Sequence, residues 1–490
     1  MSDRNVKSYK VLVGLEIHVQ LATKSKMFTG AANGSGGEPN SQVDEQILGL
    51  PGVLPVMNKK AVESAIKVGL ALNCKIAKHT KWDRKSYYYP DLPKNYQISQ
   101  YDLPLCYEGH FDLLHKDGTM RTIRIRRAHL EEDAGKLLHD APGGYAIDHS
   151  IVDLNRAGTP LLEIVTEPDL SEPADVSLFG QELQKLVQFL GVSEGQMQMG
   201  HMRFEPNINV HITDSEGKVH KTAITEIKNL NSFSVLERAT AYEVQRQIRA
   251  WEDTGSLGRK STFGWDETRG ETFLQREKEE ANDYRYFPDP DLVPVEVNED
   301  WLTELKSQIG ELPAARRKRY VEAIGLSPVD AAILASDRAT GDFYEQAIAA
   351  GGDAKRVGNL LLSHGRRLSN LQNKPLASLG ISPQRFAEVA QLIDANTISI
   401  SSAGPIFDHL YKSDGSPAAI AGELGLTQVS DTSAIDAAIN QMIAANPKPL
   451  SDFRAGKQSA MGALVGMVMK NGKGLNPKLV QERLKGRLSG

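Results

Sequence analysis

With one exception at Leu12, hydrophobic and polar residues alternate in the first regular segment of the chain, residues 11–21. Every odd position in this segment is apolar, and the even positions carry Gly14, Glu16, His18 and Gln20. A period of two predicts a β-strand with one face against a hydrophobic core. The carboxylate of Glu16 and the imidazole of His18 then project side by side from the polar face, where both suit a hard cation or a proton in transit.

The N-terminal part of the chain combines further strands with two long helices. Alternation predicts strands at 121–127, 161–167 and 206–212. Apolar positions at helical spacing predict a helix near 173–190, with Ser171 as its N-cap. A second helix is predicted near 234–252, capped by Asn231 or Ser232. Strands with a few long helices are typical of an α+β domain.

The pattern changes at about residue 296. Alanine, leucine and charged residues dominate beyond this point, and glycines separate stretches with helical periodicity. A second break is predicted near 405–415, around the Gly404-Pro405 pair and the polar turn from Lys412 to Pro417. Because the chain is too long for one hydrophobic core, we predict three domains, at 1–295, 296–410 and 411–490.

Composition narrows the class of protein. Of the 490 residues, 40% are apolar and 24% are charged, which is typical of globular proteins. The first ten residues are polar, which argues against a secretory signal, and no uncharged apolar run approaches the length of about 18 residues that spans a membrane. Cys74 and Cys106 are the only cysteines, which excludes a disulfide framework and a four-cysteine zinc site. We therefore expect a cytoplasmic protein.

Charge is distributed unevenly along the chain. The net charge of −5 argues against a protein that is basic as a whole. Between residues 448 and 490, however, there are nine basic residues and only two acidic ones. The basic residues are Lys448, Arg454, Lys457, Lys470, Lys473, Lys478, Arg483, Lys485 and Arg487. Such a local excess is typical of a module that binds phosphate, and the alternative is an ordinary solvated helical surface.

Acidic residues in apolar surroundings are the first candidate site. Glu131 and Glu132 follow an arginine-rich strand, and Glu163 and Glu167 lie on one face of the next predicted strand. Carboxylates inside apolar strands are costly to bury alone and usually have a partner. Each one taken singly is explained by a salt bridge, whereas Glu and His from three segments together suit a divalent cation. Oxygen ligands favour Mg²⁺ over zinc or copper.

Three loops are candidates for binding phosphate or a nucleobase. The turn at 153–160 contains Asn155 and Arg156, which suit a phosphate, although a tight salt-bridged loop is the alternative. The segments 83–94 and 283–289 interleave cations with aromatic rings, which suits stacking of a nucleobase, although tyrosines also fix ordinary loops. The sequence contains no glycine-rich Walker loop, no dinucleotide fingerprint and no Gly-x-Ser-x-Gly elbow, and no amidase-type nucleophile is evident.

Taken together and in order, these segments resemble the B subunit family of the aspartyl/glutamyl-tRNA amidotransferases over nearly the whole chain. Any single motif could arise by chance, but the full series at the family's spacing could not. The motifs are Gly14–Val19, Gly49–Gly52, Tyr89–Lys94, Tyr96–Gln100, Glu131–Lys136, Asp153–Arg156, Glu226–Phe233, Asp283–Pro288, Ala460–Gly462 and Asn476-Pro477.

The resemblance implies a cradle domain with a mixed or antiparallel sheet that holds the active site. A helical domain and a small helical tail domain that contact tRNA are expected to follow. It further implies an ATP-dependent carbon–nitrogen ligase with glutamine as amido donor, in a heterotrimer with an amidase subunit and a small third subunit. ATP and Mg²⁺ would serve to phosphorylate the side-chain carboxylate of misacylated Glu-tRNA(Gln) or Asp-tRNA(Asn), and ammonia delivered through a tunnel would displace the phosphate.

The resemblance also implies roles for individual side chains. The expected catalytic and metal-binding residues are Glu16, His18, Glu132 and Glu163, with Glu131 as an outer or alternative ligand. The expected contacts to the nucleotide are Lys136, Asn155 and Arg156.

The chain departs from the family pattern in two places. Many relatives carry four cysteines at the positions of Thr29, Ala31, Asp44 and Ile47, so no structural zinc is expected here. Two acidic side chains that are common in relatives are missing from the segment 197–205. This loss motivates an alternative function, a catalytically weakened scaffold subunit that binds tRNA, although a scaffold has no need for the whole acidic set.

Overall fold

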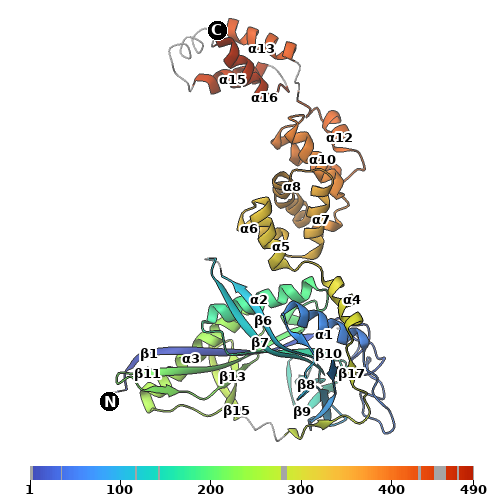
Figure 1. Ribbon diagram of the computed structural model, residues 1–490, viewed down its shortest axis with the longest axis vertical. Coiled ribbons are helices and arrows are strands. Elements are labelled where there is room, and N and C mark those ends of the chain that lie inside the picture. Colours follow the sequence, from blue (N-terminus) through green and yellow to red (C-terminus); the bar gives the residue numbers. More distant parts are fainter. Residues whose placement is uncertain are drawn as a thin grey trace. The chain divides into compact units, whose positions relative to one another are not determined.

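The computed structural model describes residues 4–34, 36–115, 118–141, 144–277, 284–428, 432–445, 460–471 and 474–488. The chain divides into two units, Met1–Leu312 and Pro313–Gly490 (Figure 1). The first unit contains the strands and the second is helical. Within the described residues, no helix is long and apolar enough to cross a membrane.

A ten-stranded sheet forms the centre of the first unit (Figure 1). Nine strands follow the order β15-β14-β13-β11-β1-β10-β7-β6-β2, and β12 pairs with β11. The described pairs are antiparallel except β13 with β14, so the sheet is mixed and the predicted α+β class is confirmed. The strands are β1 (Val6–Gln20), β2 (Lys75–Ile76), β6 (Cys106–Leu114), β7 (Met120–Glu132), β10 (Pro160–Thr166), β11 (Met202–Asp214), β12 (Val219–Lys221), β13 (Thr225–Lys228), β14 (Ser261–Asp266) and β15 (Glu271–Glu277).

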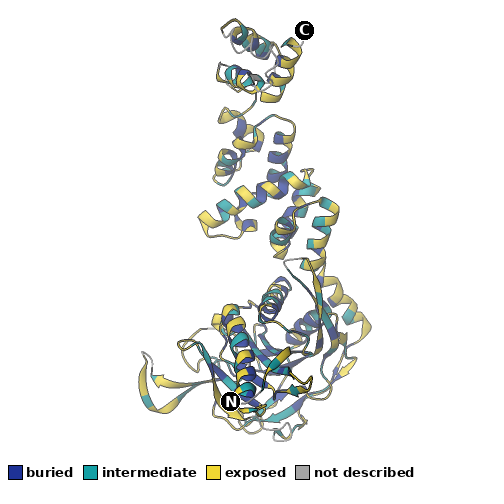
Figure 2. Ribbon diagram, turned by 90° about the vertical axis from the view of Figure 1, so that its left-hand side faces the viewer, coloured by how far each residue is buried: buried dark blue, intermediate teal, exposed yellow. Residues whose placement is uncertain are grey.

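One face of this sheet is apolar and lies under helices. Val13, Leu15 and Ile17 of β1 are fully or almost fully buried in the core, as the alternation predicts. Helices pack over this face and supply further core residues, which the burial colours of Figure 2 show. These helices are α1 (Lys59–Ala71), α2 (Pro173–Phe189) and α3 (Phe233–Thr254). Burying each such aliphatic side chain contributes about 1.5–3 kcal/mol, so the core holds the strands in one register.

The two predicted helix caps have different outcomes. The Oγ atom of Ser232 accepts a hydrogen bond from the N–H of Val235 at 3.2 Å, so the predicted cap of α3 is confirmed. The prediction for α2 is wrong, because its N-cap is Glu172 and no side chain caps it. Ser171 instead accepts a hydrogen bond from Arg121 at 2.9 Å.

The first unit continues beyond the change in composition at residue 296, because helix α4 (Glu299–Ile309) belongs to it. Leu305 belongs to the core of this unit, and Trp301 and Leu302 pack against it. Three small sheets complete the unit. Their strands are β3 (His79–Thr80) with β17 (Val295–Glu296), β4 (Asp83–Ser86) between β5 (Tyr96–Ser99) and β16 (Phe287–Pro288), and β8 (Lys136–Ala141) with β9 (Tyr145–Asp153).

The second unit consists of helices around two hydrophobic clusters. The first cluster includes Tyr344 and Phe386, and it also takes in Ile420, which lies beyond residue 410. The second includes Ile439 and Val480. The division of the chain at 295 and 410 into three domains stays a prediction. The helices are α5 (Pro313–Arg319), α6 (Pro328–Leu334), α7 (Arg338–Ala349), α8 (Ala354–Leu360), α9 (Arg366–Gln372), α10 (Pro383–Asp394), α11 (Ala403–Leu410), α12 (Pro417–Glu423), α13 (Thr432–Ala445), α15 (Ala460–Asn471) and α16 (Pro477–Leu488).

The basic tail is only partly described. Arg483 pairs with Asp436 through two hydrogen bonds, and Arg487 lies 3.8 Å from the same carboxylate. These two cations are therefore partly neutralised within the unit. Four of the nine basic residues lie outside the described residues: Lys448, Arg454, Lys457 and Lys473.

Candidate functional site

The polar face of the large sheet gathers acidic and histidine side chains from neighbouring strands. Strand β1 lies between β11 and β10, and β10 pairs with β7. The register places His18 opposite Glu163 on one side and opposite Arg203 on the other. Glu163 in turn lies opposite His129 of β7. Because residues two apart on a strand face the same way, Glu131 joins His129 on this face.

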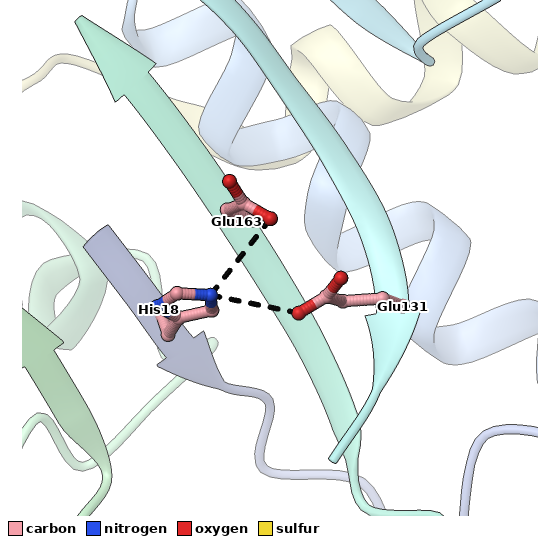
Figure 3. Close-up of side chains that lie close together, drawn as sticks. All are labelled: His18, Glu131 and Glu163. Carbon is pink, nitrogen blue, oxygen red and sulfur yellow. Dashed lines mark ion pairs between the residues drawn. The ribbon is translucent and has the colours of Figure 1, made fainter. Parts of the chain in front are cut away.

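His18, Glu131 and Glu163 form a compact group, which we call the histidine–carboxylate cluster; Figure 3 shows one side chain from each of three strands. The Nε2 atom of His18 lies 3.6 Å from Oε1 of Glu131 and 3.8 Å from Oε2 of Glu163. The Nε2 atom of His129 lies 3.3 Å from Oε2 of Glu163. Glu131 and His129 are buried, and the other two are half-buried. The cluster therefore concentrates two carboxylates where water has little access.

The two carboxylates have opposite pKa shifts. Burial and the charge of Glu163 raise the pKa of Glu131 to about 8. Burial opposes ionisation of Glu163 as well, but His129 and His18 hold the pKa of Glu163 below its ordinary value. Burial lowers the pKa of His18 to about 4, so its imidazole is neutral at pH 7. A neutral imidazole and an ionised carboxylate are the forms that bind a metal ion.

The donor set of this cluster fits a divalent cation. One ligand atom from each of His18, Glu131 and Glu163 lies within 4.8 Å of the other two. Two carboxylates and one imidazole offer the oxygen-rich ligands that Mg²⁺ or Mn²⁺ prefers. A cation would also offset the carboxylate repulsion that contributes to the raised pKa of Glu131.

A second carboxylate cluster lies beside the first on the same face. Glu16 is two residues before His18 on β1, a distance of about 7 Å along the strand. The ligand atoms of Glu16, Glu205 and Glu226 lie within 4.8 Å of one another. The ammonium of Lys228 lies 2.6 Å from Glu205 and 2.8 Å from Glu226 and offsets part of their charge. A cation at this second cluster would share these carboxylates with Lys228.

A cavity of about 970 Å³ opens beside the two clusters. Its wall includes Gln20 and Arg203 from the polar face of the sheet. The three residues predicted to contact a nucleotide, Lys136, Asn155 and Arg156, also line it. The structure therefore brings the predicted phosphate turn next to the predicted cation site. A volume of this size is typical of sites for small molecules and cofactors.

The turn that carries Asn155 and Arg156 is held in place by its own hydrogen bonds. The Nε of Arg156 donates to the carbonyl oxygen of Ala134 at 2.8 Å, and its Nη2 donates to that of Gly135 at 2.6 Å. The side chain of Asn155 donates to the carbonyl oxygen of Glu38 at 2.8 Å. Both side chains are thus fixed before any ligand binds, which lowers the entropy cost of binding.

Asp133 anchors Arg203, which lines the cavity and lies opposite His18 of the histidine–carboxylate cluster. Its carboxylate accepts hydrogen bonds from both terminal nitrogens of Arg203, at 3.0 and 3.1 Å, and from Gln20 at 2.9 Å. Burial opposes ionisation, but Arg203 and Arg156 lower the pKa of Asp133 to about 2. The guanidinium of Arg203 is therefore held rigidly at the edge of the cavity.

The two segments that interleave cations and aromatic rings lie side by side, because β4 pairs with β16. The ammonium of Lys85 lies 4.8 Å from the ring centre of Tyr284. Burial disfavours the charge of Lys85, but Glu131 and the other anionic groups around it raise its pKa above its ordinary value. Lys85 therefore stays positively charged close to the histidine–carboxylate cluster. Asp283, the first residue of the second segment, lies outside the described residues.

Glu132 is the predicted site residue that the structure places elsewhere. It follows Glu131 directly on β7, so the two side chains face opposite ways. The Oε1 atom of Glu132 lies 2.5 Å from the ammonium of Lys94 and accepts a hydrogen bond from the N–H of Ile98 at 2.9 Å. Glu131, which the sequence predicts only as an outer or alternative ligand, takes the place in the cluster that the sequence assigns to Glu132.

Arg203, Glu205 and Glu226 contribute to the site but lie outside the set that the sequence predicts. The signal for the first two is present, because β11 begins at Met202 and its burial alternates from there. Pro206 interrupts that pattern in the sequence, since proline is unusual in a central strand, and the predicted strand therefore begins too late.

The loop at 29–47, for which no structural zinc is expected, is held by contacts within this chain. The hydroxyl of Thr29 donates a hydrogen bond to Asp44, which also accepts one from the N–H of Ile47 at 3.1 Å. Ile47 packs with Leu154 and Ala157, so apolar contacts join the loop to the turn beside the cavity. That no structural zinc is needed here stays a prediction.

Comparison with known proteins adds independent findings. The family model described as "GatB/GatE catalytic domain" matches residues 11–303, and the model described as "GatB domain" matches residues 342–488. Three similar proteins are each named as the B subunit of an aspartyl/glutamyl-tRNA(Asn/Gln) amidotransferase. The protein from Carboxydothermus hydrogenoformans is 43% identical over 99% of this chain and 100% of its own length. The proteins from Thermodesulfovibrio yellowstonii and Geobacter sulfurreducens are 45% and 44% identical, over 97% and 99% of this chain and 98% and 100% of their own lengths.

Proposed function

The chain belongs to the family of aspartyl/glutamyl-tRNA(Asn/Gln) amidotransferase B subunits, and we propose that its sheet carries the ATP-dependent transamidation site of such a complex. In this proposal the complex converts the side-chain carboxylate of Glu-tRNA(Gln) or Asp-tRNA(Asn) to an amide in the cytoplasm. An amidase subunit releases ammonia from glutamine, a channel delivers it to this chain, and a small third subunit completes the heterotrimer.

The reaction needs activation because a carboxylate has no good leaving group for ammonia to displace. Transfer of the terminal phosphoryl group of ATP to a carboxylate oxygen gives an acyl phosphate and ADP. Ammonia then attacks the carbonyl carbon, the bond to the phosphate oxygen breaks, and phosphate leaves with the electron pair. A bound divalent cation offsets the negative charge on the transferred phosphoryl group.

Different residues on the polar face of the large sheet would bind the nucleotide, the cation and the substrate. The cations Lys136, Arg156 and Arg203 line the cavity and would hold the phosphates of the nucleotide. His18, Glu131 and Glu163 would hold the cation next to those phosphates. Lys85, whose positive charge is stabilised by Glu131 and the other anionic groups around it, would attract the substrate carboxylate.

One observation carries the proposal: a cation-binding donor set and a nucleotide-sized cavity share one face of the sheet and meet at Arg203. A structural salt-bridge network would explain the carboxylates alone. It would not explain why they adjoin a large cavity lined by preorganised cations.

The test is amide formation by the reconstituted complex on each misacylated tRNA, with ATP and Mg²⁺ omitted in turn. We expect both to be required. We also expect Glu163→Gln to abolish amide formation, to leave the glutaminase activity of the partner measurable, and to weaken Mn²⁺ binding by more than the roughly 10–100-fold typical for loss of an outer-shell partner. Glu167→Gln is the matched control, because Glu167 pairs with Arg126 away from the cluster. Binding of tRNA by the unaltered complex without any product would favour the scaffold function instead, with the altered segment 197–205 as its cause.

A further inference from the structure

Two tyrosine rings stack at the edge of the polar face. The ring centres of Tyr101 and Tyr286 lie 4.2 Å apart and their planes differ by 13°. Tyr286 is half-buried, whereas 43% of Tyr101 is exposed. Tyr286 covers one face of the Tyr101 ring, and among the described residues no other aromatic ring stacks on Tyr101. The pair therefore presents a flat aromatic surface to solvent.

The backbone of Tyr101 is fixed from both sides. Its N–H donates a hydrogen bond to the buried carboxylate of Asp83 at 3.0 Å. Its carbonyl oxygen accepts one from Arg127 at 2.9 Å. An exposed tyrosine held in this way loses little freedom when a flat ligand stacks on it.

The stacked pair adjoins the histidine–carboxylate cluster. Ser99, two residues before Tyr101, donates a hydrogen bond from its hydroxyl to Oε2 of Glu131 at 3.5 Å. Arg127 shares the polar face of β7 with Glu131, four residues along, which is about 13 Å. The aromatic surface also lies near Lys85, whose ammonium is 4.8 Å from the ring centre of Tyr284, which is itself 6.3 Å from that of Tyr286. Lys85 is not among the residues that line the nucleotide-sized cavity.

Arg127 differs from the other arginines of its strand. Arg124 and Arg126 each form a two-pronged ion pair with a carboxylate, Asp169 and Glu167 respectively. Among the described residues, no carboxylate pairs with Arg127, whose one side-chain hydrogen bond is to the carbonyl oxygen of Tyr101. The aromatic surface therefore has an uncompensated cation beside it, which complements a phosphate.

We propose that the Tyr101–Tyr286 stack binds the unpaired base at the 3′ end of the aminoacyl-tRNA, and that Arg127 binds the phosphate next to that base. The reasoning rests on the proposed function, because the amino acid to be amidated is esterified to the 3′-terminal ribose. Its side chain must reach the cluster while the base stays outside. Aromatic stacking with a neighbouring cation is the usual way in which proteins bind single-stranded nucleic acid.

The experiment pairs a protein variant with a matching change in the RNA. The complete complex is assayed with Glu-tRNA(Gln) that carries either the normal 3′-terminal nucleotide or the same ribose without its base. This second substrate can be made by ligating a chemically glutamylated abasic dinucleotide to a truncated tRNA. We expect Tyr101→Ala to raise KM for the intact substrate about 5-fold to 150-fold, the range that one base stack contributes, with little change in kcat. Wild type should lose the same factor on the abasic substrate, and Tyr101→Ala should lose nothing further on it.

Conservative and control variants make the test specific. Tyr101→Phe keeps the ring and should retain the wild-type KM, whereas Tyr145→Ala removes an exposed tyrosine on β9 that lies outside the stack and should have no effect. Arg127→Gln should reduce the dependence of log(kcat/KM) on log[salt] by about 0.7, the loss of one phosphate contact to a single strand.

The outcomes separate this inference from the proposed function. Equal KM for wild type and Tyr101→Ala, or independent losses that multiply when the variant meets the abasic substrate, would overturn the stacking role. Two results together would show that Tyr101 makes a protein contact instead. Tyr101→Ala would fail to assemble into the complex in size-exclusion chromatography, and the wild-type complex would have the same KM for the abasic and the intact substrate. Failure of the wild-type complex to amidate the intact substrate would contradict the proposed function itself.

Discussion

Lys26 offers the sharpest test of the electrostatics inside the first unit. Its side chain is fully buried, with 0% of its surface exposed. Its ammonium donates to the carbonyl oxygen of Ala157 at 2.7 Å and lies 3.5 Å from that of Leu154. These carbonyls belong to the turn that carries Asn155 and Arg156 into the cavity. Burial lowers the pKa of Lys26 to about 8.

The size of the effect follows from the two protonation equilibria. With an ordinary pKa of 10.5 and a folded-state pKa of about 8, the charged form of Lys26 costs the folded state about 3 kcal/mol at pH 7. The unfolded chain keeps its proton to a higher pH than the folded chain. The contribution of Lys26 to the free energy of unfolding therefore rises with pH between about 8 and 10.5, and its cost is about 2 kcal/mol smaller at pH 9.5 than at pH 7.

Replacement of Lys26 by methionine removes both the charge and its hydrogen bonds. Loss of the buried charge stabilises the variant, whereas loss of the charge-assisted hydrogen bonds, at about 1.5–3 kcal/mol each, destabilises it, so the two effects oppose each other at pH 7. Since only the wild type gains stability as Lys26 loses its proton, we expect it to gain about 2 kcal/mol over Lys26→Met between pH 7 and pH 9.5.

The assay is urea unfolding followed by tryptophan fluorescence. All four tryptophans, at positions 82, 251, 265 and 301, lie in the first unit, so the signal reports the unfolding of that unit alone. Lys60→Met, a change to an exposed lysine on α1, is the control and should show no such trend. A stability difference between wild type and Lys26→Met that stays constant from pH 7 to 9.5 would refute the reasoning.

Three further predictions concern stability and reactivity. Burial raises the pKa of both cysteine thiols, so iodoacetamide at pH 8 should alkylate neither in the folded chain and both in urea, as counted by mass spectrometry. Gly49→Ala should destabilise the first unit by more than Gly52→Ala in urea unfolding. Both glycines have positive φ, at 67° and 86°, but only at Gly49 would a Cβ atom meet a backbone atom, 2.9 Å away at Lys94. Glu132→Gln should lower the free energy of unfolding by about 3–5 kcal/mol, because it leaves a buried lysine unpaired, and an unchanged urea midpoint would contradict this.

The local pattern of hydrophobic and polar residues predicted much of the fold. The register between paired strands, which the sequence does not show, determines which side chains meet in the site. The alternation around Glu16 and His18 placed both on the polar face, because burial of the odd residues leaves the even residues no other direction. The choice between Glu131 and Glu132 could not be made in this way. Both are acidic, adjacent and buried, and only the pairing of β7 with β10 shows which of them meets His18.

Long-range contacts were the other feature that the sequence could not supply. Lys85 and Tyr286 are far apart in the chain, and each belongs to a short segment with weak periodicity. Their meeting depends on the pairing of β4 with β16, which involves only two residue pairs. The segments were predicted as separate candidates for binding a nucleobase, but nothing in either of them indicated that they form one surface beside the carboxylates.

Strand β1 shows how hydrophobic packing enforces the geometry of the charged site. Its even residues Glu16, His18 and Gln20 face the second carboxylate cluster, the histidine–carboxylate cluster and the Asp133–Arg203 anchor, at steps of about 7 Å. A slip of one residue would turn these side chains into the core under α2 and α3 and would expose Leu15 and Ile17. Each buried aliphatic side chain contributes about 1.5–3 kcal/mol, and each buried unpaired charge costs several kcal/mol, so the slipped register is far less stable. The cluster therefore tolerates the repulsion between its two carboxylates because the apolar faces of β1, β7 and β10, and not the charges, set where its side chains lie.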